Sequence, residues 1–421
     1  MANNFDSNFS RKLMKTFLDK FESKRNLSSE VDTQLFAGKF DPSTGDTIDV
    51  KRPTDFRTVR TAKGDVSGET KSDIITGKAS AVVQDYFTAF VDFDEADEAL
   101  KLDQLDQLLD PMATRIVTDF ETDFAKFMMK NTALLAGTVG TSVSTWDHVA
   151  EAGAIMQASG VPMDGSWKYA ANPFVQRALA SNQRSLGGET GSMTANQKAV
   201  ISENFAGMKV LTATTLASYQ TGTGADRAGT VVGTPVATYL AAKDTMTQVI
   251  GVTAFQANLV VKAGETVIVS TRGRLNLSTR QPMINGAGAV IVFSGTVTQD
   301  VTLDGSGAGN LTITGPAIYE ATGQYNTVSS AIAASDVITL GGAASTLIQP
   351  NLFWHKQAFT CASVPIKKLY STDTVGTTAD GLQMRVSKGS QFLQNKNEIR
   401  IDFRPAYGVL NPFFAGQGFG S

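Results

Sequence analysis

The stretch VIGVTAFQANLVVKAGETVIVSTRG, residues 249–273, decides the fold class of this 421-residue chain. Short runs rich in Val, Ile and Leu alternate in it with turn residues, which is typical of β-strands. It lies within residues 222–345, which hold 17 of the 38 glycines and 13 charged residues, against 64 charged residues elsewhere. This contrast indicates one domain inserted into another. The near-regular spacing of the runs predicts an antiparallel barrel or sandwich.

The composition excludes several classes of protein. The formal net charge of −3 and the absence of a basic cluster at either end give no electrostatic footprint for nucleic-acid binding. Cys361 is the only cysteine, which excludes a disulfide scaffold, and we expect it to be a buried apolar side chain. No apolar run is long enough for a membrane span, and the first residues lack the apolar core of a signal peptide. We therefore expect synthesis in the cytosol and no membrane contact.

Motifs for catalysis or cofactor binding are missing from the sequence. There is no phosphate-binding loop of the GxxxxGK[ST] type, no HExxH, no CxxC and no GxSxG nucleophile elbow. A glycosidase needs two carboxylates that leave no sequence signature, and nothing favours such a pair here. We expect no catalytic, cofactor-binding or metal-binding residues, and no enzyme.

An amphipathic helix is predicted over residues 8–24. Phe9 and Phe17 belong to an apolar stripe that recurs every four residues, and basic residues occupy the other faces. So aromatic a helix needs a partner surface. This surface is either the core of the same subunit or that of a neighbouring subunit.

Residues 46–91 predict a long hairpin whose tip has too few apolar residues to fold by itself. We expect it to project and to be ordered by something else. Between Lys51 and Lys78 there are seven basic and four acidic residues. The basic candidates for a contact between subunits are Lys51, Arg52, Arg57, Arg60 and Lys63.

The next segment has the opposite charge, because residues 92–110 contain eight acidic residues and one basic residue. They lack the turn glycine and the glutamate spacing of a calcium loop, so we favour a solvated face or a contact with a basic loop over a cation site. The acidic candidates for such a contact are Asp94, Glu95, Asp97 and Glu98. Opposite charges on one chain suit head-to-tail contacts between copies.

A long helix is predicted over residues 111–136, with Asp110 as the N-cap and Pro111 at the first helical position. Its apolar side chains recur at every fourth position and predict a buried face. A strand over 167–171 and a helix from Asn172 to Ala180 follow, which indicates an α+β lobe.

Several of these residues also carry a resemblance to a known family. The run Trp146-x-x-Val149-Ala150-x-Ala152-x-x-Ile155-Met156, followed by Tyr169-x-x-Asn172-Pro173, resembles the major capsid proteins of short-tailed double-stranded DNA phages. Asn351-x-Phe353-Trp354 is similar to the same family's re-entry after an inserted domain. Arg400-Ile401, Tyr407-Gly408-Val409 and Pro412 are similar to its last strand. The order of these elements matches along nearly the whole chain.

The resemblance implies the tailed-phage capsid fold, which is α+β, with an inserted antiparallel β-barrel. It implies an N-terminal arm over 1–45, an extended loop with its flanks over 46–91, a peripheral domain over 92–142 and 385–421 that contains the helix 111–136, an axial domain over 143–221 and 346–384, and an inserted domain over 222–345.

The function implied by the resemblance is that of a major capsid protein of the virion, assembled in the bacterial cytoplasm. Its implied partners are other copies in pentameric and hexameric capsomers of an icosahedral shell, a scaffolding protein, a portal protein, and DNA enclosed without sequence-specific binding. Expansion of the shell would follow DNA entry. A basic loop with Arg272, Arg274 and Arg280 could bridge capsomers or could be a solvated turn. The alternative function is a secreted or surface β-rich binding protein.

Overall fold

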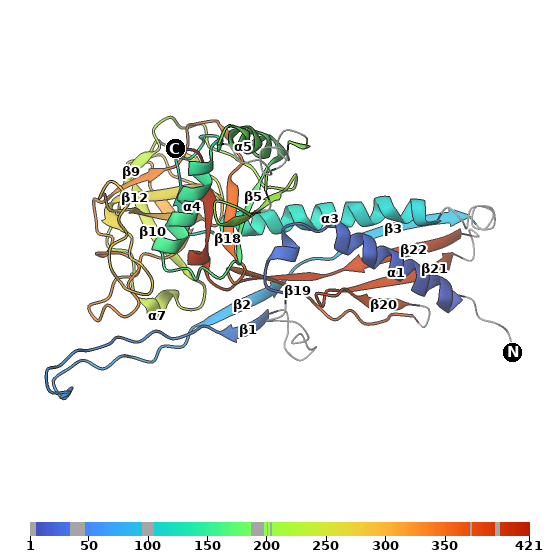
Figure 1. Ribbon diagram of the computed structural model, residues 1–421, viewed down its shortest axis with the longest axis horizontal. Helices are drawn as coiled ribbons and strands as arrows, with labels where there is room; N and C mark the ends of the chain where they lie inside the picture. Colours follow the sequence, from blue (N-terminus) through green and yellow to red (C-terminus); the bar gives the residue numbers. More distant parts are fainter. Residues whose placement is uncertain are drawn as a thin grey trace. The chain divides into compact units, whose positions relative to one another are not determined.

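The computed structural model describes residues 6–33, 47–94, 105–186, 198–199, 201–202, 204–370, 373–391 and 396–421. The chain forms two compact units, and each is described by itself. The first unit consists of residues 1–49, 80–125 and 359–408, and the second of residues 50–79, 126–358 and 409–421. Figure 1 shows the elements of both units.

Among its described residues, the first unit contains two four-stranded sheets and the helical segments that pack on them. Its helices are α1 (Asp6–Lys24), a 3₁₀ turn η1 (Ser28–Glu30), and the greater part of α3 (Leu105–Lys130). One sheet has the order β20-β21-β22-β3 and the other β1-β2-β23-β19. The strands are β1 (Thr47–Lys51), β2 (Lys78–Val83), β3 (Phe87–Asp94), β19 (Phe359–Ser363), β20 (Thr374–Thr377), β21 (Gln383–Gln391), β22 (Lys396–Phe403) and β23 (Pro405–Val409).

Aromatic side chains join the helices to the sheets of this unit. Phe21 of α1 lies with its ring centroid 5.3 Å from that of Phe403, and Phe120 of α3 lies 5.0 Å from Phe403 in an edge-on arrangement. Phe124 continues the buried face of α3 toward Tyr407, at 5.2 Å. The i, i+4 stripe predicted for this helix is therefore its core face, because buried aromatic rings contribute large apolar areas.

The predicted bounds of the long helix, 111–136, each lie six residues too late in the sequence, which is about 1.7 turns at 3.6 residues per turn. Helix α3 begins at Leu105, so Pro111 lies inside it rather than at its first position. The helix ends at Lys130, where the Asn131 side chain donates to the Phe127 carbonyl at 2.8 Å. Residues Leu134–Ala136 form strand β4 instead, because they pair in parallel with β24 (Ala415–Gly418). A partner strand distant in sequence thus overrides the local helical pattern.

The second unit contains a six-stranded sheet of order β4-β24-β18-β5-β7-β6. Helices α4 (Trp146–Ala158) and α5 (Pro173–Leu186) bury apolar residues in one cluster with it, including Val149, Leu179 and Tyr169. The remaining strands are β5 (Trp167–Ala171), β6 (Asn204–Phe205), β7 (Met208–Thr212) and β18 (Asn351–His355), with a 3₁₀ turn η3 (Pro412–Phe414) before β24.

The same unit contains a closed antiparallel barrel of order β10-β15-β13-β12-β16-β9. Apolar residues alternate along its strands, so Ile250 and Val252 of β10 are buried while Val249 is 54% exposed. The expected α+β class with an inserted antiparallel barrel is therefore confirmed. The barrel strands are β9 (Ala228–Val231), β10 (Thr247–Thr253), β12 (Thr266–Gly273), β13 (Val292–Val297), β15 (Gly309–Thr314) and β16 (Val337–Leu340).

The chain enters and leaves the barrel at one place. Strands β8 (Tyr219–Gln220) and β17 (Leu347–Ile348) pair there, and the Ser345 amide donates to the Gly222 carbonyl at 3.0 Å. Short strands β11 (Val260–Val261) and β14 (Val301–Thr302) form a side ribbon. A single helical turn, α7 (Tyr239–Ala242), lies between β9 and β10.

The strand pairing divides the chain after residue 346 differently from the expected domains. Strands β20, β21 and β22 belong to the sheet that contains β3, whereas β24 near the C-terminus pairs with β18 and β4. The expected halves, 346–384 and 385–421, are thus each shared between the two units.

Candidate assembly surfaces

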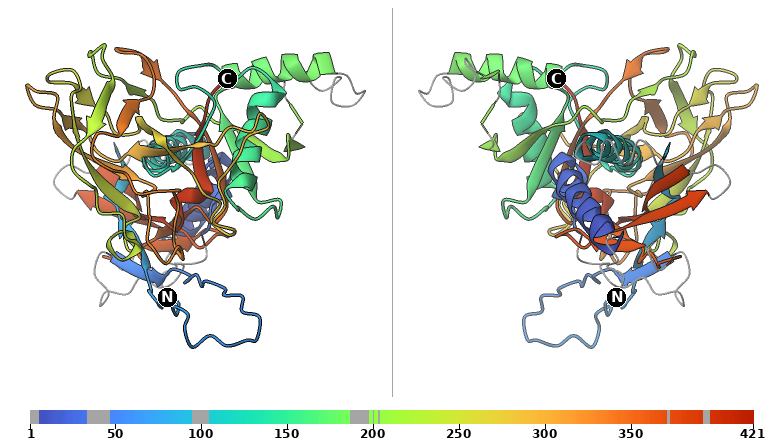
Figure 2. Two further views of the ribbon diagram at one scale, coloured as in Figure 1. Left: turned by 90° about the vertical axis from the view of Figure 1, so that its left-hand side faces the viewer. Right: turned by 90° about the vertical axis from the view of Figure 1, so that its right-hand side faces the viewer.

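Residues 52–77 form a two-armed loop without regular secondary structure, and most of its side chains are exposed. Figure 2 shows the loop extending away from the strands at its root. The two arms contact each other where the Arg57 amide donates to the Ser72 hydroxyl at 3.0 Å. Of the basic candidates, Lys51, Arg57, Arg60 and Lys63 are exposed. Apolar side chains are exposed here too, since Phe56 is 59%, Val66 58% and Ile74 74% exposed. The loop thus presents a mixed basic and apolar surface.

Arg52 is buried at the root of this loop and is not available to a neighbour. Its guanidinium donates to the Lys78 carbonyl at 3.0 Å, to the Val409 carbonyl at 3.1 Å and to the Leu410 carbonyl. Burial lowers the pKa of Arg52 to about 10. The expectation that Arg52 belongs to the contact surface is therefore wrong, because its donors join the two arms to the chain near β23.

The inserted barrel holds both arms of the loop within the same subunit. The Gln324 side-chain amide donates to the Asp73 carbonyl at 3.0 Å and also to the Asp55 carbonyl. Arg280 forms an ion pair with the Asp55 carboxylate, and Arg57 donates to the Thr322 carbonyl at 3.4 Å. The barrel of the same subunit therefore orders the part of the loop around Asp55 and Asp73. The Arg280 candidate is thus engaged within its own subunit.

Arg272 and Arg274 do not form the expected projecting basic loop. Arg272 donates to both carboxylate oxygens of Asp336 at 2.7 Å, with both side chains largely buried. Arg274 is 3% exposed, donates to the Ala133 carbonyl at 2.7 Å and lies 5.5 Å from the Phe293 ring centre. Burial lowers the pKa of Arg274 to about 10. Strand β12 continues to Gly273, so these guanidinium groups turn inward, where carboxylate and carbonyl oxygens accept their hydrogen bonds.

The N-terminal helix packs on the core of its own unit. Phe17 is fully buried, with its ring centroid 6.3 Å from that of Phe21. The first of the two alternatives therefore holds for Phe17, whereas the Phe9 side chain lies outside the described residues. Arg25, just after the helix, forms an ion pair of 3.0 Å with Asp380.

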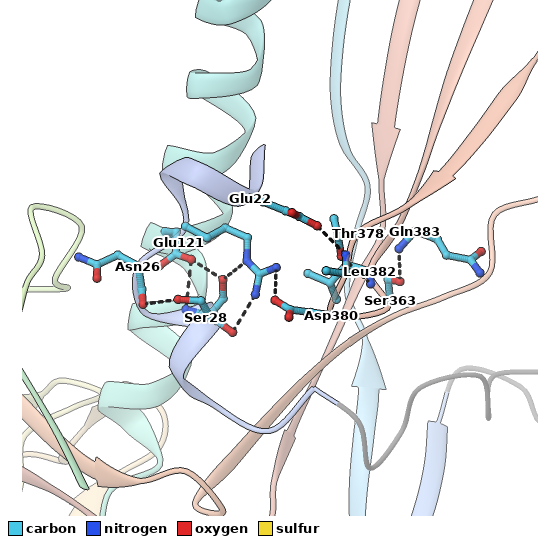
Figure 3. A network of polar contacts seen from close by, with 12 residues as sticks. Glu22, Asn26, Ser28, Glu121, Ser363, Thr378, Asp380, Leu382 and Gln383 are labelled. Carbon is cyan, nitrogen blue, oxygen red and sulfur yellow. Dashed lines mark hydrogen bonds and ion pairs between the residues drawn. The ribbon is translucent and has the colours of Figure 1, made fainter. Parts of the chain in front are cut away.

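A buried carboxylate fixes the chain directly after this helix (Figure 3). Glu121 of α3 is 1% exposed and accepts hydrogen bonds from the Leu27 amide at 2.8 Å, the Ser28 amide at 3.1 Å and the Ser28 hydroxyl. Burial raises the pKa of Glu121, although these three hydrogen bonds oppose the rise. Glu121 thus caps η1 from a helix about ninety residues away in the sequence.

Most of the predicted acidic surface lies outside the part of the chain that the structure describes. This holds for Glu95, Asp97 and Glu98 and for the side chain of Asp94. Their neighbour Asp92 is described and forms an ion pair of 3.0 Å with Lys396, whose hydrogen bond lowers the pKa of Asp92. Among the described residues there is no cluster of three or more His, Cys, Asp or Glu side chains that could hold a metal ion.

The cysteine and the two histidines, which are the side chains with catalytic potential, are engaged within the subunit. Cys361 is buried in β19, and burial raises the pKa of its thiol to about 12. The His148 ring nitrogen accepts from the Ser144 amide at 3.1 Å at the start of α4. His355 lies 3.1 Å from the Asp164 carboxylate, and its other ring nitrogen accepts from the Gln357 amide. Each of these groups thus stabilises local structure in the subunit.

Sequence patterns did not point to Gln324 or Asp55. A glutamine in a turn is common on protein surfaces, and its role here depends on two backbone carbonyls from a loop about 250 residues earlier in the sequence. The compensating charges of Asp55 and Arg280 could have suggested a pair, but many other pairings were equally open.

Residues 1–420 match the family described as "P22 coat protein - gene protein 5". The chain belongs to the P22 coat protein family. It is also 35% identical over 425 residues to the "Major capsid protein" of Acyrthosiphon pisum secondary endosymbiont phage 1, with both chains covered completely.

Two of the similar solved structures come from phages. One, of Mycobacterium phage Che8, is 12% identical with a TM-score of 0.47 and covers 94% of this chain and 93% of its own. The other, the capsid of Ralstonia phage GP4, is 9% identical with a TM-score of 0.41 and covers 90% and 84%. No helix among the described residues is long and apolar enough to cross a membrane.

Membership of this family gives the protein its role and its place. It is a coat protein, a structural subunit of a phage capsid, and it is a component of the virion. The family is not a class of enzymes. It gives no support to the alternative of a secreted or surface binding protein.

Proposed function

We propose that this coat protein assembles into the pentameric and hexameric capsomers of an icosahedral shell, by head-to-tail contacts between its extended loop and a neighbouring subunit. The shell would form with a scaffolding protein and a portal protein and would expand as double-stranded DNA enters. The DNA would be enclosed without sequence-specific binding. The formal net charge of −3 suits that role, because a strongly basic inner face would hinder packaging.

The exposed surface of the extended loop carries this proposal. Phe56, Val66 and Ile74 lie exposed on a segment without a core of its own. Exposed apolar side chains gathered on one segment indicate a binding surface for another protein. Arg60 and Lys63 lie near the tip, and neither forms an ion pair within the described part of the chain. Both charge and apolar area are therefore available to a second copy.

The partner surface in this proposal is the acidic segment of the next subunit, Asp94, Glu95, Asp97 and Glu98. Its charge is opposite to that of the loop tip, so attraction would guide the two surfaces together. A contact between two different surfaces of one chain closes into a ring when the rotation permits. Such rings are capsomers.

Reversal of the exposed loop charges tests this contact. Arg60→Glu with Lys63→Glu is preferable to a variant at Arg57, because Arg57 also contacts the barrel of its own subunit. The protein would be co-expressed with its scaffolding protein and examined by sedimentation and negative-stain electron microscopy. We expect closed shells from the unchanged protein and few or none from the variant.

A charge-swapped variant supplies the matched control. Glu95→Lys with Glu98→Lys, added to the loop reversal, should restore shells if the two surfaces meet. Normal assembly of the loop reversal alone would show that these charges do not form the contact. A small, monodisperse species from the unchanged protein in the presence of scaffold would contradict the proposed capsomers.

A further inference from the structure

Gln324 contacts both arms of the extended loop with a single amide group. It lies in the segment between β15 and β16 and is 5% exposed. Its nitrogen donates to the carbonyls of Asp55 on the outgoing arm and Asp73 on the returning arm. A side-chain amide has two N–H donors, so both hydrogen bonds can form together. The two arms are thereby joined through the barrel.

Arg280 supplies a second contact from another barrel segment. It lies between β12 and β13, with a positive φ of 57° that few residues other than glycine adopt. One guanidinium nitrogen donates to the Asn326 carbonyl at 2.8 Å and another pairs with the Asp55 carboxylate. Arg280 therefore connects the loop to the same barrel segment that carries Gln324.

The segment that carries Gln324 is itself firmly held. The Asn326 side chain accepts from the Glu320 amide at 2.7 Å and donates to the Glu320 carbonyl at 3.2 Å. The Tyr325 ring stacks on Tyr239, with ring centroids 3.9 Å apart and planes 8° from parallel. Ile75 of the loop packs against the apolar cluster that contains these rings. The loop is therefore joined to a rigid part of the barrel.

We propose that the inserted barrel sets the direction of the extended loop, with Gln324 and Arg280 as positioning residues. An arm held at one point can swing, whereas two arms joined to one rigid support cannot swing independently. Residues 56–72 beyond the clamp have no apolar core, so their direction depends on this support. The consequence for assembly rests on the proposed function, since the loop direction would decide where a neighbour is met.

A distance measurement in the free subunit tests the clamp. Spin labels would be placed on Ser67→Cys near the loop tip and Ser270→Cys on β12, both exposed positions. Cys361 is the only native cysteine and is buried, so labelling is selective. Pulsed electron–electron double resonance should give a narrow distribution of distances between the two labels in the unsubstituted loop. Gln324→Ala in the same background should broaden it, whereas Gln281→Ala, an exposed glutamine beside Arg280, should leave it narrow.

A charge exchange separates the clamp from general damage. Asp55→Arg alone should broaden the distribution, and Asp55→Arg with Arg280→Asp should narrow it again. Unchanged circular dichroism would show that the barrel remains folded. A broad distribution in the unsubstituted pair, or an unchanged one in Gln324→Ala, would overturn the proposal. Because the subunit is unassembled, neither result depends on whether shells form.

Discussion

At the scale of single residues, burial of charged side chains distinguishes structural groups from those available to a partner. Arg52, Arg274 and Glu121 lie inside the subunit, with backbone groups as their main hydrogen-bond partners. Such groups are costly to bury unless their hydrogen bonds are made, so they fix the arrangement of the segments that supply the partners. Arg60 and Lys63, in contrast, have no such role within the described subunit.

Glu121 gives a pH-dependent prediction at this scale. Its pKa is raised by burial, so the folded protein holds the proton more tightly than the unfolded chain does. The stability from this proton is fully present below the ordinary glutamate pKa of about 4.3 and is lost as the pH rises through the raised value. We expect the free energy of unfolding of the unchanged protein, relative to Glu121→Gln, to increase as the pH falls from neutral.

The measurement is urea unfolding of both proteins across this pH range, followed by circular dichroism. Glutamine is neutral throughout, and the other titrating groups are common to both proteins, so the difference isolates Glu121. The same difference in stability at every pH would show that the pKa of Glu121 is unshifted.

At the scale of elements, partners distant in sequence determine where helices and strands begin and end. Residues 134–136 have a helical pattern in the sequence and become a strand because β24 is beside them. Pro111, inside α3, cannot donate a hydrogen bond to the preceding turn, but the apolar face of the helix continues past it. Packing thus outweighs a local preference at both ends of this helix.

A barrel turn gives the prediction at this scale. Gly307 has a φ of +70°, and a Cβ there would lie 1.8 Å from the Phe255 carbonyl oxygen. Gly305, two residues earlier, has open space around it and no positive φ. Gly307→Ala should therefore lower the free energy of unfolding by at least about 2 kcal/mol, through strain and steric overlap.

Thermal unfolding of Gly307→Ala and Gly305→Ala in parallel checks this prediction. Gly305→Ala should remain close to the unchanged protein. Equal stability of the two variants would mean that the turn can rearrange around the added methyl group.

At the scale of the whole molecule, the inserted barrel has the features of an independent folding domain. Its strands close on themselves, so no open sheet edge remains, and its buried residues form a continuous apolar cluster. We expect residues 222–345, expressed alone, to give the circular dichroism of a β-protein and a cooperative thermal transition. Ile313→Asp, which puts a charge into the barrel core, should abolish that transition. A fragment without cooperative unfolding would show that the barrel needs the rest of its unit.

The sequence by itself determined the features that depend on local pattern and composition. The charge-poor, glycine-rich segment 222–345 predicted an inserted β domain, either a barrel or a sandwich, because strand periodicity and turn residues are short-range signals. The i, i+4 stripe of residues 116–128 predicted the core face of α3, and the bounds of β5, Trp167–Ala171, were found without change. The charged residues of the extended loop were also recognisable in the sequence, because a solvated segment without a core is rich in charged side chains.

Only the tertiary structure decided which of those charges face solvent. Arg272, Arg274 and Arg280 lie close together in the sequence, and no local pattern distinguishes them. In the structure Arg272 pairs with Asp336, Arg274 is buried beside Ala133, and Arg280 pairs with Asp55. Gln324 joins two carbonyls 18 positions apart in a loop encoded far upstream. Such contacts are set by where distant backbone segments meet, and hydrogen-bond partners at that separation leave no periodic trace in one sequence.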